Sequence, residues 1–246
     1  MTDLKTVTFD VESTGVDTEN DRIITCFLRA KDGDNVVFER NWIINAGVEV
    51  PKEASDVHGM TTEWVQENGR TDVAEAISEI ANAIANHFRD GFVICGFNHA
   101  FDLAMLNSEL ERYHGEGLET SAEFREGRYI DPAIFSRVFD KYVKGGHKLI
   151  TVAQRNGIEV EEDRLHAADY DVEVTEKLVK IMLNRAWREL ADVRKDKTPD
   201  EFVTALQTWQ AEQKKIWAEH TTAYFESAGK TEDDGSKIIV SGAFPW

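Results

Sequence analysis

Four acidic side chains in three separate segments of the sequence could together hold divalent metal ions. Asp10 and Glu12 stand two apart in the strand-like run 6–12, so both should project from the same face of that strand. Asp102 follows a short apolar run, and Asp171 opens a later helical stretch. Carboxylate oxygens suit Mg²⁺ or Mn²⁺, and four such groups without cations would repel one another. If the segments meet, the sequence predicts a site for two ions.

A pair of such ions can activate a water and stabilise both the attacking and the leaving oxygen when a phosphodiester is hydrolysed. One histidine could serve as the base that takes the proton of this water. His166 precedes Asp171 by five positions, a spacing that would point the two apart on a regular helix. They can converge only if His166 belongs to the turn that enters the helix. An imidazole with an unperturbed pKa of ~6.5 can accept a proton near neutral pH. His99, three residues before Asp102, is the main rival.

Each segment taken alone also has an ordinary structural interpretation. The acidic pair could lie on the wet face of an amphipathic strand, and Asp102 could simply favour a helix N-terminus by ~0.3–1 kcal/mol. His166 could be a surface histidine, and Asp169 and Asp171 could be solvated charges. The joint occurrence of the three segments is what favours chemistry.

The bulk composition indicates a globular protein with little affinity for long nucleic acids. The 246 residues include 28 Lys and Arg against 46 Asp and Glu, a net charge of −18. This balance argues against a broad basic groove and favours contact with few nucleotides, with weakly salt-dependent binding and low processivity. No apolar run is long enough for a membrane helix and no signal peptide is visible, so we expect a cytoplasmic protein. Cys26 and Cys95 should be free, buried thiols.

Hydrophobic periodicity and turn residues predict the order of the main elements. We expect an antiparallel start, an irregular stretch over 45–63 interrupted by Pro51 and Gly59, and a loop over 115–127. The expected strands cover 5–12, 22–30, 36–44, 92–97 and 129–130. The expected helices are a short one beginning at Thr61, those over 73–88, about 101–110, 133–142 and 149–156, a long one opening near 168, and another after Thr198.

The order D-x-E-x-T-G, then N-x-x-F-D, then H-x-x-x-x-D resembles the three motifs of the DEDDh 3′–5′ exonucleases. This DnaQ-like family includes proofreading subunits of replicative DNA polymerases. The stretches 51–61 and 148–158 resemble further family segments, so the similarity covers about residues 4–188. It implies an α/β, RNase H-like fold in which a mixed central sheet lies between helices. The departures are small: Ser13, Phe97 and Val152 replace residues common in the family, and none of them is a ligand.

The resemblance also implies roles for individual residues. Asp10 would bridge two Mg²⁺ or Mn²⁺ ions, Glu12 and Asp171 would complete the shell of the ion that bears the water, and Asp102 would act on the second ion. His166 would be the general base. The residues expected to bind the 3′-terminal nucleotide are Ser13, Thr14, Gly15, Val16, His58, Met60, Asn98 and Phe101.

The preferred substrate is the 3′ end of single-stranded DNA, from which 5′-mononucleotides would be released. A 3′–5′ exoribonuclease and a non-catalytic module that holds a 3′ end in a polymerase complex are the alternatives. Proofreading in DNA replication, DNA repair and scavenging are the alternative pathways for such an enzyme, and the sequence does not choose among them.

Three regions are expected along the chain: an exonuclease domain over 1–188, a helical extension over 189–228 and a tail over 229–246. Thr198 and Glu201 form a capping box that should open a long helix. Its apolar stripe should pack on the nuclease body, or else bind a polymerase or another replication protein. The apolar end of the tail, 238–246, could fold back as a strand or dock on a partner.

Overall fold

The computed structural model describes residues 4–161, 164, 166–231 and 236–245, and a five-stranded mixed sheet forms its centre. The strand order is β3-β2-β1-β4-β5. β1 pairs antiparallel with β2, and β2 with β3, whereas β4 runs parallel to β1 and β5 parallel to β4. The strands cover Lys5–Ser13 (β1), Ile23–Asp32 (β2), Asn35–Ile43 (β3), Val93–Cys95 (β4) and Tyr129–Ile130 (β5). The antiparallel start is confirmed.

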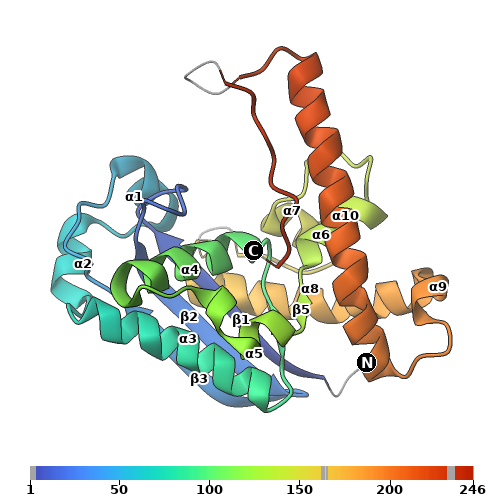
Figure 1. Ribbon diagram of the computed structural model, residues 1–246, viewed down its shortest axis with the longest axis horizontal. Helices are drawn as coiled ribbons and strands as arrows, with labels where there is room; N and C mark the ends of the chain where they lie inside the picture. Colours follow the sequence, from blue (N-terminus) through green and yellow to red (C-terminus); the bar gives the residue numbers. More distant parts are fainter. Residues whose placement is uncertain (1–3, 162–163, 165, 232–235, 246) are drawn as a thin grey trace.

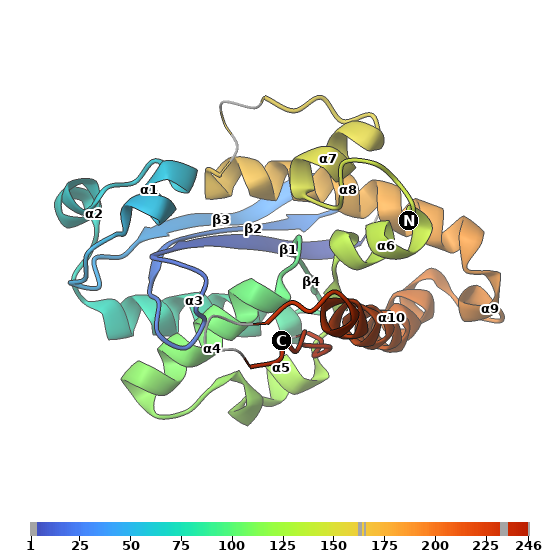
Figure 2. The ribbon, with the colours of Figure 1, turned by 90° about the horizontal axis from the view of Figure 1, so that it is seen from above.

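Strand β1 lies in the middle of the sheet because its alternating residues can pack on both faces. Val7, Phe9 and Val11 are almost completely buried and belong to the core cluster with helices α3 (Val73–Arg89) and α4 (Ala100–His114). The intervening residues point to the opposite face, which is covered by α8 (Ala168–Glu189). Seen from above, α3 and α4 lie on one side of the sheet and α7 and α8 on the other (Figure 2).

Two stretches expected to lack regular structure contain short helices. Within 45–63, α1 (Lys52–His58) begins directly after Pro51. The next helix, α2 (Thr62–Asn68), is capped by Thr61 and confirms the short helix expected there. Within 115–127, the 3₁₀ helix η1 (Leu118–Thr120) and α5 (Ala122–Glu126) bury Leu118 and Phe124 in the core. The expectation of irregular structure is wrong for 52–58 and 118–126, and in the second of these segments two apolar anchors suffice to order short helices.

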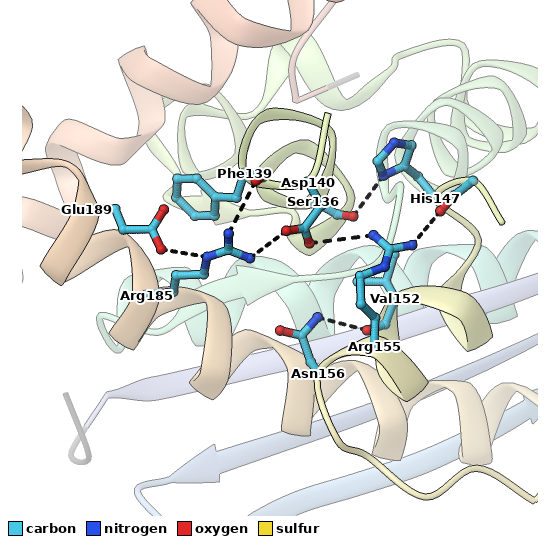
Figure 3. Close-up of polar contacts among 10 residues, drawn as sticks. Ser136, Phe139, Asp140, His147, Val152, Arg155, Asn156, Arg185 and Glu189 are labelled. Atoms are coloured by element: carbon cyan, nitrogen blue, oxygen red, sulfur yellow. Dashed lines mark hydrogen bonds and ion pairs between the residues drawn. The ribbon is translucent and has the colours of Figure 1, made fainter. Parts of the chain in front are cut away.

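Helices α6 (Pro132–Phe139), α7 (Leu149–Arg155) and α8 are held together by one carboxylate. Asp140, directly after α6, accepts hydrogen bonds from Arg185 of α8 at 2.8 Å and from Arg155 of α7 at 3.5 Å (Figure 3). Next to this network, Ser136 Oγ lies 2.8 Å from His147 Nδ1. These contacts fix the connection between α6 and α7 against the body of the protein.

The helical extension is integrated into the body. After the short α9 (Ala191–Arg194), α10 (Pro199–Ser227) opens with the predicted capping box. Phe202 and Leu206 are fully buried against β4, α6 and α8, which confirms that this part of the stripe packs within the chain. The second half of α10 rises away from the sheet (Figure 1) and leaves Ile216 and Tyr224 exposed.

The described part of the C-terminal tail returns along α10 to the body. Val240 N–H donates to Thr222 Oγ1 at 3.0 Å, and the ring of Phe244 contacts His99 and Tyr129. Residues 238–245 form no strand, so the tail folds back in an extended, non-sheet form. Cys26 and Cys95 are buried free thiols, as predicted. Among the helices that the structure describes, none has the length and apolarity to cross a membrane.

Candidate active site

Three of the four predicted carboxylates converge at one point. Asp10 and Glu12 leave β1 on the face covered by α8, and Asp171 lies in the first turn of that helix. One carboxylate oxygen from each of the three lies within 4.8 Å of the others. Residues 161 positions apart therefore meet because α8 packs directly across the central strand. This spacing is suitable for a shared divalent cation.

Asp102 lies beside this group and is anchored to the strand that carries it. The residue is in the first turn of α4 and only 5% exposed. Its Oδ1 accepts a hydrogen bond of 3.0 Å from the backbone N–H of Val11, between the two acidic residues of β1. The charge of Asp102 also acts on Asp10 and Glu12. The structure thus brings the fourth carboxylate to the edge of the site.

The protein environment disfavours the ionised form of all four carboxyl groups. Burial is the main cause, and mutual repulsion adds to it for Asp10 and Glu12: the pKa of Asp10 is well above its usual value and that of Glu12 is raised to about 8. Burial raises the pKa of Asp102 to about 7, although the Val11 amide opposes the shift. Burial likewise raises the pKa of Asp171 to about 6, against the charge of His166.

These residues fit a divalent cation. Asp171 Oδ1 is buried, and no described residue donates a hydrogen bond to it. An acceptor oxygen in this state is costly unless a cation or a proton neutralises it. The neighbouring groups that could bind a metal ion are the carboxylates of Asp10 and Glu12, so all potential ligands are hard oxygens. Asp10, Glu12 and Asp171 would hold the ion.

His166 stands at the entrance of the site. It has a left-handed backbone conformation, with φ of 63°, one residue before the N-cap of α8, and its side chain is exposed. Its backbone N–H is hydrogen-bonded to Asp171, so the turn that carries the imidazole is tied to a metal-binding candidate. Burial lowers the pKa of His58, and the proximity of His166 adds to this effect. Both histidines therefore face the same region.

His99, the other candidate for the general base, is part of the packed core. His99 is completely buried, its ring stacks on Tyr129 with a centroid distance of 5.7 Å, and its Nδ1 lies 3.1 Å from the carbonyl oxygen of Gly96. Burial lowers its pKa, although Asp131 opposes the shift. A side chain enclosed in this way cannot reach a solvent-borne substrate.

The loop after β1 is organised by Asp21, which sequence reasoning missed. Thr14 Oγ1 donates to Asp21 Oδ1 and Asp17 N–H donates to Asp21 Oδ2, both at 2.9 Å. A Cβ on Gly15 would lie 2.3 Å from Asp21 Oδ2, so a larger residue here would displace the carboxylate that holds the loop. Ser13 and Thr14 are buried, whereas Val16 is 88% exposed. Of the predicted pocket residues in this loop, Val16 is the one that faces solvent.

The other predicted substrate-binding residues lie around the same end of the sheet. His58 Nδ1 accepts from Met60 N–H at 3.2 Å, and Met60 packs beside Val50 and Val65. Phe101 is partly buried against the core of the α3 and α4 side. These contacts show that Met60 and Phe101 also have a packing role.

Asp131 is a second residue near the site whose role was not predicted from the sequence. Asn98 has φ of 62°, and its backbone N–H donates to Asp131 Oδ1 at 2.9 Å. The same oxygen caps α6 through Ala133 N–H, and the charge of Asp131 raises the pKa of Asp102 as a minor cause. Asp131 followed by Pro132 is a recognisable helix start, but nothing local in the sequence predicts its contact with Asn98.

Comparisons with known proteins agree with this geometry. The family model described as "Exonuclease" (RNase_T) matches residues 7–179. The DNA polymerase III PolC-type protein of Streptococcus agalactiae is 27% identical over 222 residues, covering 90% of this chain and 14% of the relative. The PolC-type protein of Mycoplasma genitalium is 24% identical over 179 residues, covering 72% of this chain and 11% of the relative. The chain therefore spans only a small part of these relatives.

Solved structures share the fold. The zinc-bound form of an E. coli ExoI–ssDNA complex superposes with a TM-score of 0.62 and 18% identity, over 77% of this chain and 42% of that one. E. coli exonuclease I with a dT13 oligonucleotide gives a TM-score of 0.62 and 17% identity, over 82% and 46% of the two chains. The mixed sheet between helices is thus the RNase H-like exonuclease fold. Since the family model matches more than half of the chain, this chain belongs to the exonuclease family.

Proposed function

We propose that the protein hydrolyses the phosphodiester bond at the 3′ end of single-stranded DNA and releases 5′-mononucleotides. The observation that carries this proposal is the convergence of Asp10, Glu12 and Asp171 within 4.8 Å, with Asp102 alongside. The buried, unpartnered oxygen of Asp171 supports metal binding at the same point. Mg²⁺ or Mn²⁺ ions bound there, two in the proposed mechanism, would polarise the phosphate and make a bound water a better nucleophile.

The protein's own groups would perform the remaining steps. Asp10 and Glu12, fixed by the central strand, and Asp171 would hold the ions, while Asp102 would act on the second ion from its anchored position. His166, exposed at the entrance and tied to Asp171 through its backbone, would accept the proton of the attacking water.

Binding of the 3′-terminal nucleotide would use the loop after β1 and the residues around it. Thr14 and Gly15 would contact the nucleotide through their backbone, which Asp21 holds in place. The exposed Val16 could pack against the terminal sugar or base. The side chains that would complete this pocket are Ser13, His58, Met60, Asn98 and Phe101.

DNA is the preferred substrate because the related proteins are named for it. The curated relatives are DNA polymerases, and the solved neighbours contain single-stranded DNA or deoxyoligonucleotides. The alternatives are an exoribonuclease with the same carboxylates and a non-catalytic module that holds a 3′ end. The presence of all four carboxylates together with His166 favours a catalytic site over a passive one.

The direct test is digestion of a 5′-labelled single-stranded DNA oligonucleotide with Mg²⁺, with Mn²⁺ and with EDTA, beside a matched RNA. We expect a ladder of products shortened from the 3′ end with either metal and none with EDTA or with Asp10→Asn. Faster shortening of the RNA would replace DNA by RNA as the substrate. Tight binding of the DNA without shortening under any metal condition would favour the non-catalytic module.

A further inference from the structure

A cavity of about 320 Å³ lies between α6 and α10 and is lined by positive charge. The two helices contact each other and lie close together in both views (Figures 1 and 2). Five basic side chains line the cavity, three from Arg or Lys and two from His: Arg137, Lys141, Lys214, His147 and His220. Among the described residues that line it, none is acidic. This concentration is unusual in a chain with a net charge of −18.

Two of these side chains, Arg137 and Lys214, meet at one aromatic ring and form no ion pair within 4 Å to a described residue. Lys214 is 7% exposed, and its ammonium lies 5.2 Å from the ring centroid of Trp217. The guanidinium of Arg137 lies 4.5 Å from the same ring, and its Nη1 is buried with no hydrogen-bond acceptor among the described residues. The charge of Asp131 acts on both groups, but Asp131 does not line the cavity. An anion bound in the cavity would give the buried Nη1 of Arg137 an acceptor and would offset the two positive charges.

The basic character continues along the segment 137–148, which joins α6 to α7. It contains Arg137, Lys141, Lys144, His147 and Lys148 but only one acidic residue, Asp140. Asp140 is turned inward to Arg155 and Arg185 (Figure 3), so it does not neutralise the outer side of the segment. Tyr142 is 91% exposed beside Lys141, whose ammonium lies 5.7 Å from its ring centroid. An exposed aromatic ring among cations is typical of surfaces that bind single-stranded nucleic acid.

We propose that the cavity and the segment 137–148 bind backbone phosphates of the substrate strand, upstream of the bond that is cut. The cations extend over two helices and a loop, which suits successive phosphates of one strand better than a single small anion. Asp131 connects the two regions: its Oδ1 accepts from the backbone N–H of Asn98, four residues before Asp102, at 2.9 Å, and its own N–H donates to Gln210 Oε1 of α10, four residues before Lys214, at 2.8 Å. That the bound strand is single-stranded DNA rests on the proposed function.

The experiment measures binding in EDTA, so that its result is independent of hydrolysis. The anisotropy of a labelled thymidine strand of about 12 nucleotides is compared with that of a labelled thymidine trinucleotide. In Lys141→Gln/Lys144→Gln, both substitutions are at exposed positions that cannot disturb the core. We expect about tenfold weaker binding of the long strand, unchanged binding of the trinucleotide, and a salt dependence whose slope is smaller by about 1.4, the value for two phosphate contacts.

The matched control is Lys195→Gln/Lys197→Gln, which makes the same change in net charge at the turn between α9 and α10. Equal affinities of the two double variants for the long strand would overturn the proposal, whatever the outcome of the digestion assay. Lys214→Met is the second test, because it keeps the buried stem and removes the charge. We expect weaker binding of the long strand with an undiminished melting temperature, whereas a merely structural lysine would lower the melting temperature and leave binding unchanged.

Inorganic phosphate and thymidine 5′-monophosphate serve as further probes. One outcome contradicts the proposal: either compound raises the melting temperature of the wild type but not of Lys214→Met, and the variants still bind the long strand normally. The cavity would then be a site for a free phosphate compound. If the long strand competes with these compounds in the wild type alone, the proposal is supported.

Discussion

Asp102 Oδ1 accepts a hydrogen bond from the backbone N–H of Val11, a residue 91 positions earlier in the chain, at 3.0 Å. The bond fixes the first turn of α4 against the strand segment that carries Asp10 and Glu12. One carboxylate therefore has two tasks, since it positions α4 and also contributes charge to the candidate active site. The two tasks can be separated by substitution.

Asp102→Asn should keep the hydrogen bond and lose the charge, whereas Asp102→Ala should lose both. We expect both variants to lose most of their nuclease activity. The Ala variant should be less stable than the Asn variant by about 1–3 kcal/mol, because it leaves the Val11 amide buried without an acceptor. Urea unfolding in EDTA measures this difference, and equal stability of the two variants would show that the hydrogen bond does not hold α4.

The metal-free protein should become more stable as the pH falls from about 8.5 toward 6. The pKa values of Glu12 and Asp102 in the folded protein are about 8 and 7, both above their ordinary values. The ionised groups therefore destabilise the folded state at high pH, and protonation removes this penalty as the pH falls through those values. Thermal unfolding in EDTA across this range measures the effect.

Glu12→Gln is the control for the general acidity of the chain, because it removes one titrating group from the cluster and leaves the other acidic residues unchanged. Its melting temperature should depend less on pH over the same range. Added Mn²⁺ should stabilise the wild type more at pH 8 than at pH 6, since protons compete for the same oxygens. Identical pH profiles of the wild type and Glu12→Gln would contradict the assigned shift.

His166→Gln should reduce turnover by a factor of roughly a hundred or more, the usual contribution of a general base. Metal binding should be largely retained, because the imidazole is exposed and the backbone contact to Asp171 remains. Single-turnover hydrolysis gives the rate, and the shift of the melting temperature with Mn²⁺ reports binding. His114→Gln, at an exposed position on α4, is the matched control. A normal rate for His166→Gln would remove this residue from the mechanism.

Gln210→Leu should destabilise the protein by about 3 kcal/mol. Gln210 is fully buried on α10, its Oε1 accepts from Asp131 N–H and its Nε2 donates to the carbonyl oxygen of Tyr129, each at 2.8 Å. Leucine fills a similar volume but leaves both backbone groups unsatisfied. Urea unfolding provides the measurement, with the exposed Glu212→Gln as a control that should change stability by less than about 0.5 kcal/mol. An unaffected Gln210→Leu would mean that α10 is not part of the cooperative fold.

The elements that contain the motifs could be predicted because each has a local pattern. The alternation of Val7, Phe9 and Val11 and the helical stripe of Ile77, Ile80 and Ile84 agree with the observed strand and helix. The short helices over 52–58 and 118–126 were missed because their order depends on a few apolar contacts with the core. Likewise, the residues of the tail could not show whether it folds back on the protein, because Phe244 is positioned by the rings of His99 and Tyr129, which are distant in the sequence.

The sequence by itself determined the family, the central strand and the identity of the carboxylates, since these follow from residue types at short spacings. Tertiary structure alone decided that Asp10, Glu12 and Asp171 form the closest group while Asp102 is held at its edge by Val11. It also decided that His99 is enclosed in the core and that Arg137 and Lys214 meet at the ring of Trp217. The physical reason is that burial and charge pairing depend on which distant segments pack together, and side-chain spacing along the chain does not encode this.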